Sequence, residues 1–214
     1  MKKALLTIAT IGLAVSAMAQ GTVNFLNYVE GGAGITFEQL IYGPNPGNPS
    51  QALSGSSSAD VPPGATAYAG APLQGSRYVA ELWAGPASVT DASLLTLAGS
   101  TTFYDAASGA PAGLFQPVTG TVGGVAAGAQ AKFEIRVWDT QSGSSFATAG
   151  VSGRSGLFSS VAPLGGSDAG GNVIFPPDST GWSSFNIASA VPEPSTFALA
   201  GLGAAALLIF RRRK

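Results

Sequence analysis

Two carboxylates in apolar, strand-like segments are the residues best placed for chemistry in this sequence. Glu81 lies in RYVAELWAG and Glu134 lies in KFEIRVWD. On neighbouring strands the two could face one another, as the acid and nucleophile of glycosidases do. Alternation offers a simpler interpretation, with Lys132, Glu134 and Arg136 on a solvent face and Glu81 as a cross-strand partner of Arg136. We favour the simpler one, because nothing forces a raised pKa, and keep a carboxylate-based polysaccharide hydrolase or lyase as an alternative.

The sequence lacks the residues that other kinds of catalytic site require. The sequence contains no histidine and no cysteine, which excludes Ser-His-Asp triads, Cys-His dyads and ordinary zinc sites. It also contains no GxxxxGK[ST] phosphate-binding loop. We therefore expect no enzymatic activity, no catalytic residues, no cofactor and no metal.

Aromatic side chains are the stronger candidates for binding. Trp83 and Trp138 end their predicted strands, and alternation places Trp138 on the polar face. An exposed ring there could stack on the apolar face of a sugar, so Trp138 and Trp83 are candidate glycan-stacking residues. The alternative is that Trp83, Trp138 and Trp182 close the ends of a hydrophobic core.

Two related segments, YDAASG and WDTQSG, each place an aspartate after a strand and a glycine four residues later. Asp105 and Asp139 could accept backbone N–H groups in Asx turns, while the glycines supply positive φ. Calcium ligation by either aspartate is the alternative. A calcium site needs about six to eight oxygen ligands, whereas each loop offers one carboxylate, so we favour turns.

The body alternates in β-branched and aromatic residues rather than following a helical period, and only Asp91 to Leu95 suggests a single helical turn. Many short strands with glycine-rich turns predict an all-β fold, an antiparallel β-sandwich or jelly-roll-like body. The predicted strands are Thr22 to Val29, Gly34 to Tyr42, Arg77 to Trp83, Ala131 to Trp138 and Trp182 to Ile187.

A segment rich in Gly, Pro, Ser and Ala, residues 43–76, interrupts this pattern. Its composition buries little apolar surface, which predicts a long surface loop. An additional edge strand at Thr66 to Ala69 is the alternative. We expect one body domain, residues 20–190, that contains this loop.

The charge of the body differs from that of the whole chain. Of eleven acidic residues only Glu193 lies in the terminal segments, whereas six of the ten basic residues lie there. Ten acidic and four basic residues remain, a net charge of minus six. This charge disfavours nucleic acid as a partner, because such binding depends on Lys and Arg at the phosphates.

The first 19 residues have the features of a secretion signal. Two lysines precede an apolar run, and Ala17 and Ala19 supply the small residues that a signal peptidase requires. A buried N-terminal helix would not need this combination. We expect signal peptidase to cleave after Ala19.

The last 24 residues, 191–214, contain VPEP, an apolar run over 197–210 and the basic end RRRK. Fourteen apolar residues are fewer than the roughly twenty needed to span a bilayer. The basic residues would stop translocation with the C-terminus in the cytoplasm. A short helix here would hold the chain in the inner membrane, at least transiently. A plain anchor helix after a linker is the alternative.

The order of these three parts resembles the PEP-CTERM sorting signal, in which a membrane-embedded exosortase is thought to cut at or near Pro-Glu-Pro. The resemblance implies that Pro192, Glu193 and Pro194 are recognition residues and that the protein is exported to the cell envelope or extracellular matrix, often with a link to biofilm. Two prolines keep such a segment extended and outside helices and sheets.

The body resembles, more loosely, other secreted proteins that carry this signal, through YVAELWAGPA, FEIRVWDT and GSSFATAGVSGRSG. That resemblance implies no activity. We expect a structural or adhesive component of the cell surface or matrix, with extracellular polysaccharide as a possible partner. A carbohydrate-binding module that uses exposed tryptophan is the alternative.

Overall fold

The structure is a computed structural model that describes residues 20–168 and 170–190. The signal helix expected over 1–19, with Ala17 and Ala19, lies outside these residues. So does the tail, 191–214, with Pro192, Glu193 and Pro194.

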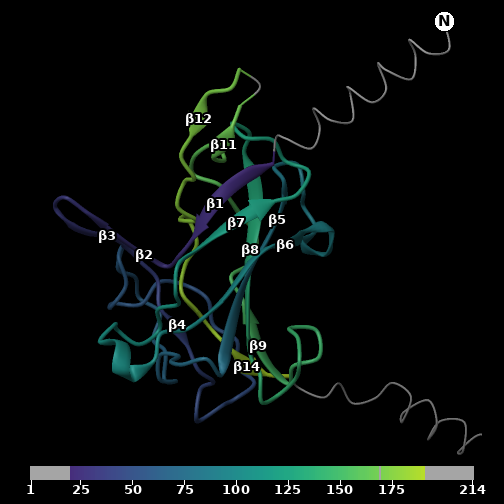
Figure 1. The fold of residues 1–214 in the computed structure, drawn as a ribbon. Helices are drawn as coiled ribbons and strands as arrows, with labels where there is room; N and C mark the ends of the chain where they lie inside the picture. The colour runs from purple at the N-terminus through teal and green to yellow at the C-terminus, as the bar shows by residue number, and fades with distance from the viewer. Residues whose placement is uncertain (1–19, 169, 191–214) are drawn as a thin grey trace, which may run out of the picture.

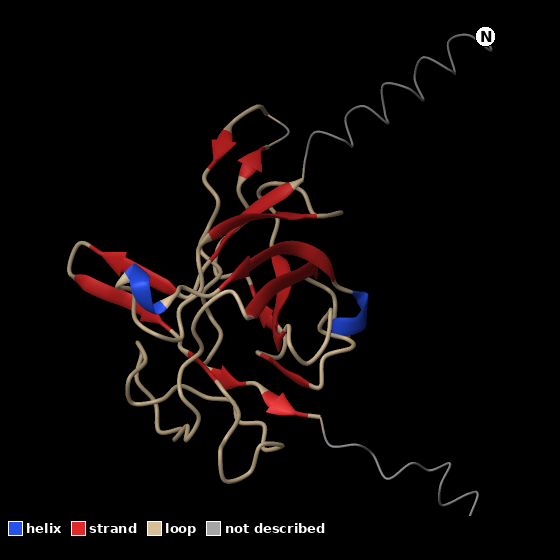
Figure 2. Cartoon of the chain, turned by 60° about the horizontal axis from the view of Figure 1, so that its bottom comes forward, coloured by secondary structure: helices blue, strands red, loops and turns tan. Residues whose placement is uncertain are grey.

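The described chain is all-β, as predicted, with two single-turn 3-10 helices (Figures 1 and 2). Every paired strand is antiparallel to its partner except β4 and β13, which are parallel. In chain order the elements are β1 (Gly21–Phe25), β2 (Tyr28–Gly31), β3 (Gly34–Glu38), β4 (Ile41–Tyr42), β5 (Tyr78–Pro86), η1 (Ala92–Leu94), β6 (Thr96–Thr102), η2 (Ala106–Ser108), β7 (Val118–Val122), β8 (Ala131–Asp139), β9 (Val151–Arg154), β10 (Phe158–Ser159), β11 (Gly166–Ser167), β12 (Val173–Ile174), β13 (Phe185–Asn186) and β14 (Ala188–Ser189).

The largest sheet is built on β5 and β8, which pair over their full lengths. Its strand order is β14-β9-β8-β5-β6, and β10 also pairs with β8. At one edge, Ser189 of β14 donates its N–H to the Pro49 carbonyl and Ala190 donates to the Gly150 carbonyl, both at 2.8 Å. The chain is therefore hydrogen-bonded into the body up to Ala190.

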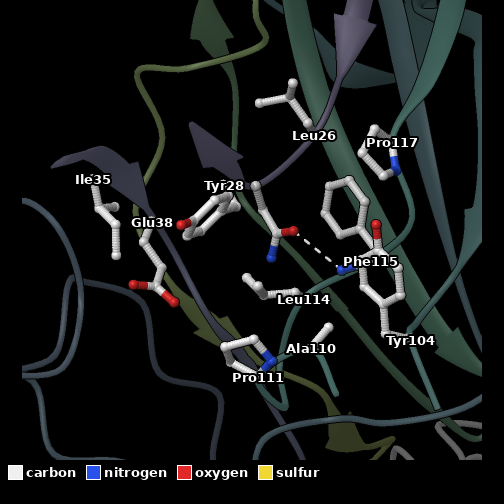
Figure 3. A pocket seen from close by; sticks show the side chains of 11 residues that line it. Leu26, Tyr28, Ile35, Glu38, Tyr104, Ala110, Pro111, Leu114, Phe115 and Pro117 are labelled. Carbon is white, nitrogen blue, oxygen red and sulfur yellow. Dashed lines mark hydrogen bonds between the residues drawn. The ribbon is translucent and has the colours of Figure 1, made fainter. Parts of the chain in front are cut away.

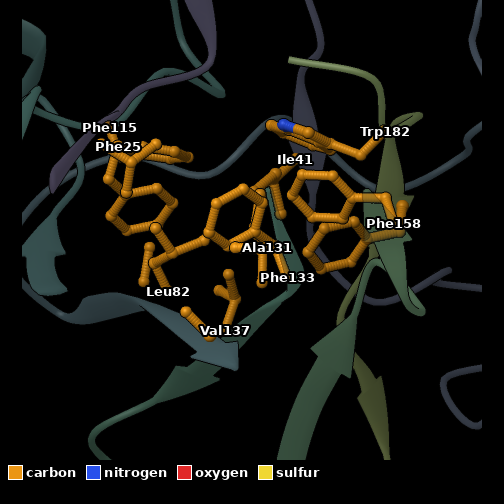
Figure 4. Close-up of a cluster of buried hydrophobic side chains, with 14 of the residues drawn as sticks. Phe25, Ile41, Leu82, Phe115, Ala131, Phe133, Val137, Phe158 and Trp182 are labelled. Carbon is orange, nitrogen blue, oxygen red and sulfur yellow. The ribbon is translucent and has the colours of Figure 1, made fainter. Parts of the chain in front are cut away.

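A second layer covers the inner face of this sheet. It contains the β1–β7 pair, which lies close to β6 because Gly99 and Gly120 allow the two backbones to approach. The core between the layers is rich in aromatic rings (Figure 4). Phe25 and Phe115 lie with ring centroids 4.4 Å apart, and Phe133 and Phe158 lie 5.5 Å apart.

Strand alternation predicted the inner face of β8 correctly. Phe133, Ile135 and Val137 are fully buried in the core. The predicted turn near Asp91 is also present as η1, where Asp91 Oδ1 accepts the N–H of Ser93 at 2.9 Å.

Residues 43–76 form an irregular segment that is fixed to the body by buried polar groups. No strand is assigned within it, and Thr66 to Ala69 are not in a strand. The carboxylate of Asp60 accepts hydrogen bonds from Leu40 N (3.1 Å), Ser184 Oγ (2.7 Å) and Ser57 N. Because Leu40 and Ser184 lie outside the segment, next to β4 and β13, Asp60 holds the segment against these two strands.

The β2–β3 hairpin projects from the body, at the left of Figure 1. The register pairs Tyr28 with Glu38 and Val29 with Phe37, and it shifts at a bulge between Val29 and Glu30. Directly opposed residues share a face of the hairpin, so Tyr28 and Glu38 lie on one face and Val29 and Phe37 on the other. Each face borders a separate pocket.

Candidate functional site

The predicted carboxylate pair is not an open catalytic site. Glu81 and Glu134 lie on neighbouring strands and on one face, since Glu81 is opposite Arg136 and Glu134 is opposite Trp83. Glu134 is only 2% exposed and accepts a hydrogen bond from Arg136 Nε at 2.6 Å. Glu81 accepts the indole N–H of Trp83 at 2.8 Å. Both carboxylates are thus bound by protein groups.

The solvent-exposed ladder predicted for this face is wrong at Glu134, which is buried. The reason is that groups from outside the sheet cover this face. Arg136 donates from Nη2 to the Ala92 carbonyl of η1 at 2.8 Å, and its guanidinium lies 4.1 Å from the centroid of the Trp83 ring and 5.5 Å from that of Phe146. The register confirms Glu81 as the cross-strand neighbour of Arg136, but the guanidinium forms its ion pair with Glu134 instead.

The exposure predicted for Trp138 is wrong as well. Its side chain is buried, and its indole nitrogen has no hydrogen-bond partner in the described part of the chain. It lies on the central strand β8, opposite Val79 of β5 and Ser152 of β9. Trp182 is also buried, whereas Trp83 is half-buried. Of the two tryptophans proposed to stack on glycans, only Trp83 keeps an accessible surface.

Asp139 forms the predicted Asx turn, with its Oδ1 accepting the Gln141 N–H at 3.0 Å. Arg77 also donates to both of its oxygens, at 2.9 and 2.5 Å, and this hydrogen-bonded guanidinium lowers the pKa of Asp139. Asp105 accepts no such side-chain bond, although Gly109 after it has the expected positive φ of 75°. The described residues contain no group of three or more potential metal-binding side chains.

A pocket of about 450 Å³ beside the β2–β3 hairpin is the best-formed candidate site (Figure 3). Figure 3 shows Ile35, Tyr28 and Glu38 on one side and Tyr104, Phe115 and Pro117 on the other. Its lining is mostly apolar and is formed by Leu26, Asn27, Tyr28, Ile35, Glu38, Tyr104, Ala110, Pro111, Leu114, Phe115 and Pro117.

Asn27 holds the two sides of the pocket together. It interrupts the predicted strand between β1 and β2, and its amide donates to the carbonyls of Gln39 and Gly113, each at 2.9 Å. Its Oδ1 accepts the Phe115 N–H at 3.1 Å. Because this amide is fully used by the backbone, it positions the pocket wall and leaves ligand contacts to other residues.

Glu38 is the charged group of the pocket. Its backbone exchanges two 2.8 Å hydrogen bonds with Val61, which fixes the strand. Its side chain has no hydrogen-bond or ion-pair partner within residues 20–168 and 170–190, although the residue is only 9% exposed. Burial raises the pKa of the Glu38 carboxyl, and the nearby Asp60 carboxylate raises it further.

This pocket was not predicted from the sequence. One signal was available, because Glu38 follows Ile35 and Phe37 and precedes Leu40 in a largely apolar run. The opposite wall was not predictable in this way, since Tyr104 and Pro117 come from a distant segment.

Comparison with known proteins identifies the end of the chain but not the body. Residues 190–214 match the PEP-CTERM protein-sorting motif. Searches of the curated proteins and of the solved structures found no match. Within the described part of the chain, no helix combines the length and apolar character needed to cross a membrane. The chain therefore carries a PEP-CTERM sorting signal, the mark of an exported protein that an exosortase processes at the cell envelope.

Proposed function

We propose that the body is a structural or adhesive component of the cell surface or extracellular matrix and that it has no enzymatic activity. The observation that carries the proposal is the pocket beside β2–β3, an open and mostly apolar site on a projecting hairpin. The sorting signal delivers the body to a location where such a site meets extracellular material. A hydrolase or lyase is disfavoured, because Glu134 is buried against Arg136 and Glu81 binds Trp83.

The delivery step is tested by cell fractionation and intact-mass analysis. We expect the wild-type protein to be recovered outside the inner membrane, without residues 1–19 and ending near Pro194. Replacing Pro192, Glu193 and Pro194 by Ala should leave a full-length tail in the inner membrane. The matched control replaces the exposed Pro46 and Pro63 of the loop by Ala and should be processed normally. Identical processing of both variants would contradict the assignment of the recognition residues.

The adhesive role is tested with the processed protein and isolated extracellular matrix. We expect retention on the matrix without turnover of its polymer. Replacing Tyr28 by Ala should reduce retention, because the ring lines the pocket. Release of matrix oligosaccharides that Glu134→Gln abolishes would show an enzyme instead.

Carbohydrate binding through Trp83 is a second candidate. Its half-buried ring is held by the Glu81 hydrogen bond and by Arg136 over its face. A fixed aromatic ring of this kind is a suitable platform for a sugar ring. Trp83→Ala should then abolish binding on a glycan array, while Tyr28→Ala should leave it intact. Unchanged binding in Trp83→Ala would remove this candidate.

A further inference from the structure

The pocket beside β2–β3 is bordered by Glu38, a largely buried residue whose carboxylate has no protein partner among the described residues. A carboxylate removed from water loses solvation that other groups must replace, so buried carboxylates are normally paired or hydrogen-bonded. Asp60 follows this rule, with three donors on its two oxygens. Glu38 differs, since no described residue donates to its side chain and its oxygens, which are not fully buried, keep contact with the pocket. The missing donor is the first indication of a ligand.

The charges around the pocket indicate the sign of that ligand. Among the described residues no Lys or Arg lines it, and Glu38 is the one charged side chain of its lining. The neighbouring charges are also negative, because Asp60 acts on the Glu38 carboxyl and Glu30 accepts a 3.4 Å hydrogen bond from the Tyr28 hydroxyl. A body with a net charge of minus six adds to this field. An anionic ligand is therefore disfavoured and a cationic one favoured.

The walls indicate the rest of the ligand. Tyr28 and Tyr104 present aromatic rings, and Ile35, Leu114 and Pro117 add apolar surface. Aromatic rings attract cations at their faces, most strongly where water is excluded. A volume of about 450 Å³ lies within the range of small-ligand pockets.

We propose that this pocket binds an alkyl- or arylammonium group, with the positive nitrogen at the Glu38 carboxylate and the apolar part against Tyr28 and Tyr104. The inference rests on the adhesive function proposed above and specifies the chemistry that the site would recognise. The ammonium group supplies the donors that Glu38 lacks, while the aromatic and apolar walls replace water around the carbon skeleton.

The test uses the processed protein in calorimetric titrations at pH 7.5. The two probes, benzylammonium and neutral benzyl alcohol, have nearly equal shapes. We expect benzylammonium to bind at least tenfold more tightly than benzyl alcohol. Glu38→Gln should remove this preference, because the amide keeps the shape and loses the charge. Asp91→Asn, at an exposed carboxylate beside η1 that does not line the pocket, is the matched control and should keep the preference. Tyr28→Ala should weaken binding of both probes.

A pH series adds a readout that a purely structural role would not produce. Protonation of Glu38 should weaken benzylammonium binding as the pH falls, with a midpoint above the ordinary glutamate value, and should leave benzyl alcohol unaffected. Equal affinity for the two probes, or an unchanged preference in a Glu38→Gln variant that is at least as stable as wild type, would overturn the proposal.

The source of the ammonium group is distinguished by a third probe, a short peptide with one lysine. Binding of the peptide and of benzylammonium shows that polymer-borne amines are accepted, whereas binding of benzylammonium alone limits the site to small amines. Both results support the site. Loss of ammonium binding would leave the fractionation result unchanged, so failure of this inference is separable from failure of the delivery step.

Discussion

Tyr28 and Glu38 are directly opposed across the β2–β3 hairpin, and both side chains line the same pocket. The hairpin register places an aromatic ring beside a carboxylate that has no protein partner in the described structure. Such a carboxylate favours binding of a cationic ligand, while its partly desolvated charge lowers the stability of the ligand-free protein.

The first prediction concerns the effect of the Glu38 charge on the stability of the ligand-free protein. Glu38→Gln should raise the free energy of unfolding at pH 7, because it removes a desolvated charge. The pKa of Glu38 is raised in the folded state, so wild-type stability should increase as the pH falls from above the folded pKa toward the unfolded value. The difference between variant and wild type should therefore shrink as the pH falls toward about 4.3, the ordinary glutamate pKa, and stay small below it. Urea unfolding from pH 8 to 4 measures it, with Glu30→Gln as control. A variant less stable than wild type at pH 7 would show that Glu38 is paired in solution.

The second prediction concerns the buried ion pair on the outer face of β8. Glu134→Ala should destabilise the body by about 3 kcal/mol or more, because it leaves the Arg136 guanidinium without its carboxylate in a largely buried position. Arg154→Ala is the control, since Arg154 reaches the same carboxylate only at 3.9 Å and its side chain is 60% exposed. Its effect should stay below about 1 kcal/mol. Equal losses in chemical denaturation would argue against burial as the cause.

The third prediction compares two buried tryptophans. Trp182 donates its indole N–H to the Ser179 carbonyl at 2.8 Å, whereas the N–H of Trp138 has no partner among the residues that the structure describes. Trp182→Phe leaves a buried carbonyl unsatisfied, while Trp138→Phe removes an unsatisfied donor. Trp182→Phe should therefore cost about 1 kcal/mol more than Trp138→Phe. Thermal and urea unfolding of the two variants measure this difference, and the reverse order would contradict it.

The fourth prediction concerns acid stability. Arg77 lowers the pKa of Asp139 in the folded state, so this pair stabilises the protein above the ordinary aspartate pKa of about 3.9 and loses its effect as the pH falls through the lowered value. Arg77→Gln should lower the unfolding temperature at pH 7. Because Arg77 is half exposed, the loss should be no more than about 1 kcal/mol. The gap to wild type should close as the pH falls below the lowered pKa of Asp139, and a constant gap across the pH range would exclude the ion pair as its origin.

The fifth prediction concerns residues 43–76. Asp60→Ala should increase amide hydrogen exchange at Ser57 and Leu40, because both N–H groups lose their carboxylate acceptor. The rise should be at least tenfold and should extend through the segment, since Ser184 also loses its contact. Asp91→Ala is the control. The Asp91 side chain accepts a hydrogen bond from one backbone N–H, that of Ser93, so this variant should affect only the turn at η1. Exchange confined to Ser57 would show that Asp60 does not hold the segment.

Alternation of residue types predicted which side of β8 enters the core, because period two is a local property of a strand. It did not predict what covers the opposite side. Glu134 and Trp138 are buried on that side, where Ala92 and Phe146 contact Arg136, and these contacts come from other parts of the chain. Strand length was also overestimated where side-chain bonds interrupt the backbone, as Asn27 does between β1 and β2.

The pocket shows the same limit. The β2–β3 half is local, and its register follows from the hairpin and its bulge. The other half depends on Asn27 binding the Gly113 carbonyl, more than eighty residues away in the sequence. A single sequence contains no periodic signal for such a contact. The tail was predictable because its recognition depends on the order of short segments rather than on tertiary structure.

The hydrogen bond from Ala190 to Gly150 limits how far the body can stand from the enzyme that processes it. Val191 alone separates this bonded residue from Pro192. Two extended residues span at most about 7 Å, so an exosortase acting at this motif works beside the folded sheet rather than on a long tether. The β11–β12 hairpin lies at the opposite end of the body from the β9–β14 edge in Figure 1, so it is the part of the fold farthest from the processing site.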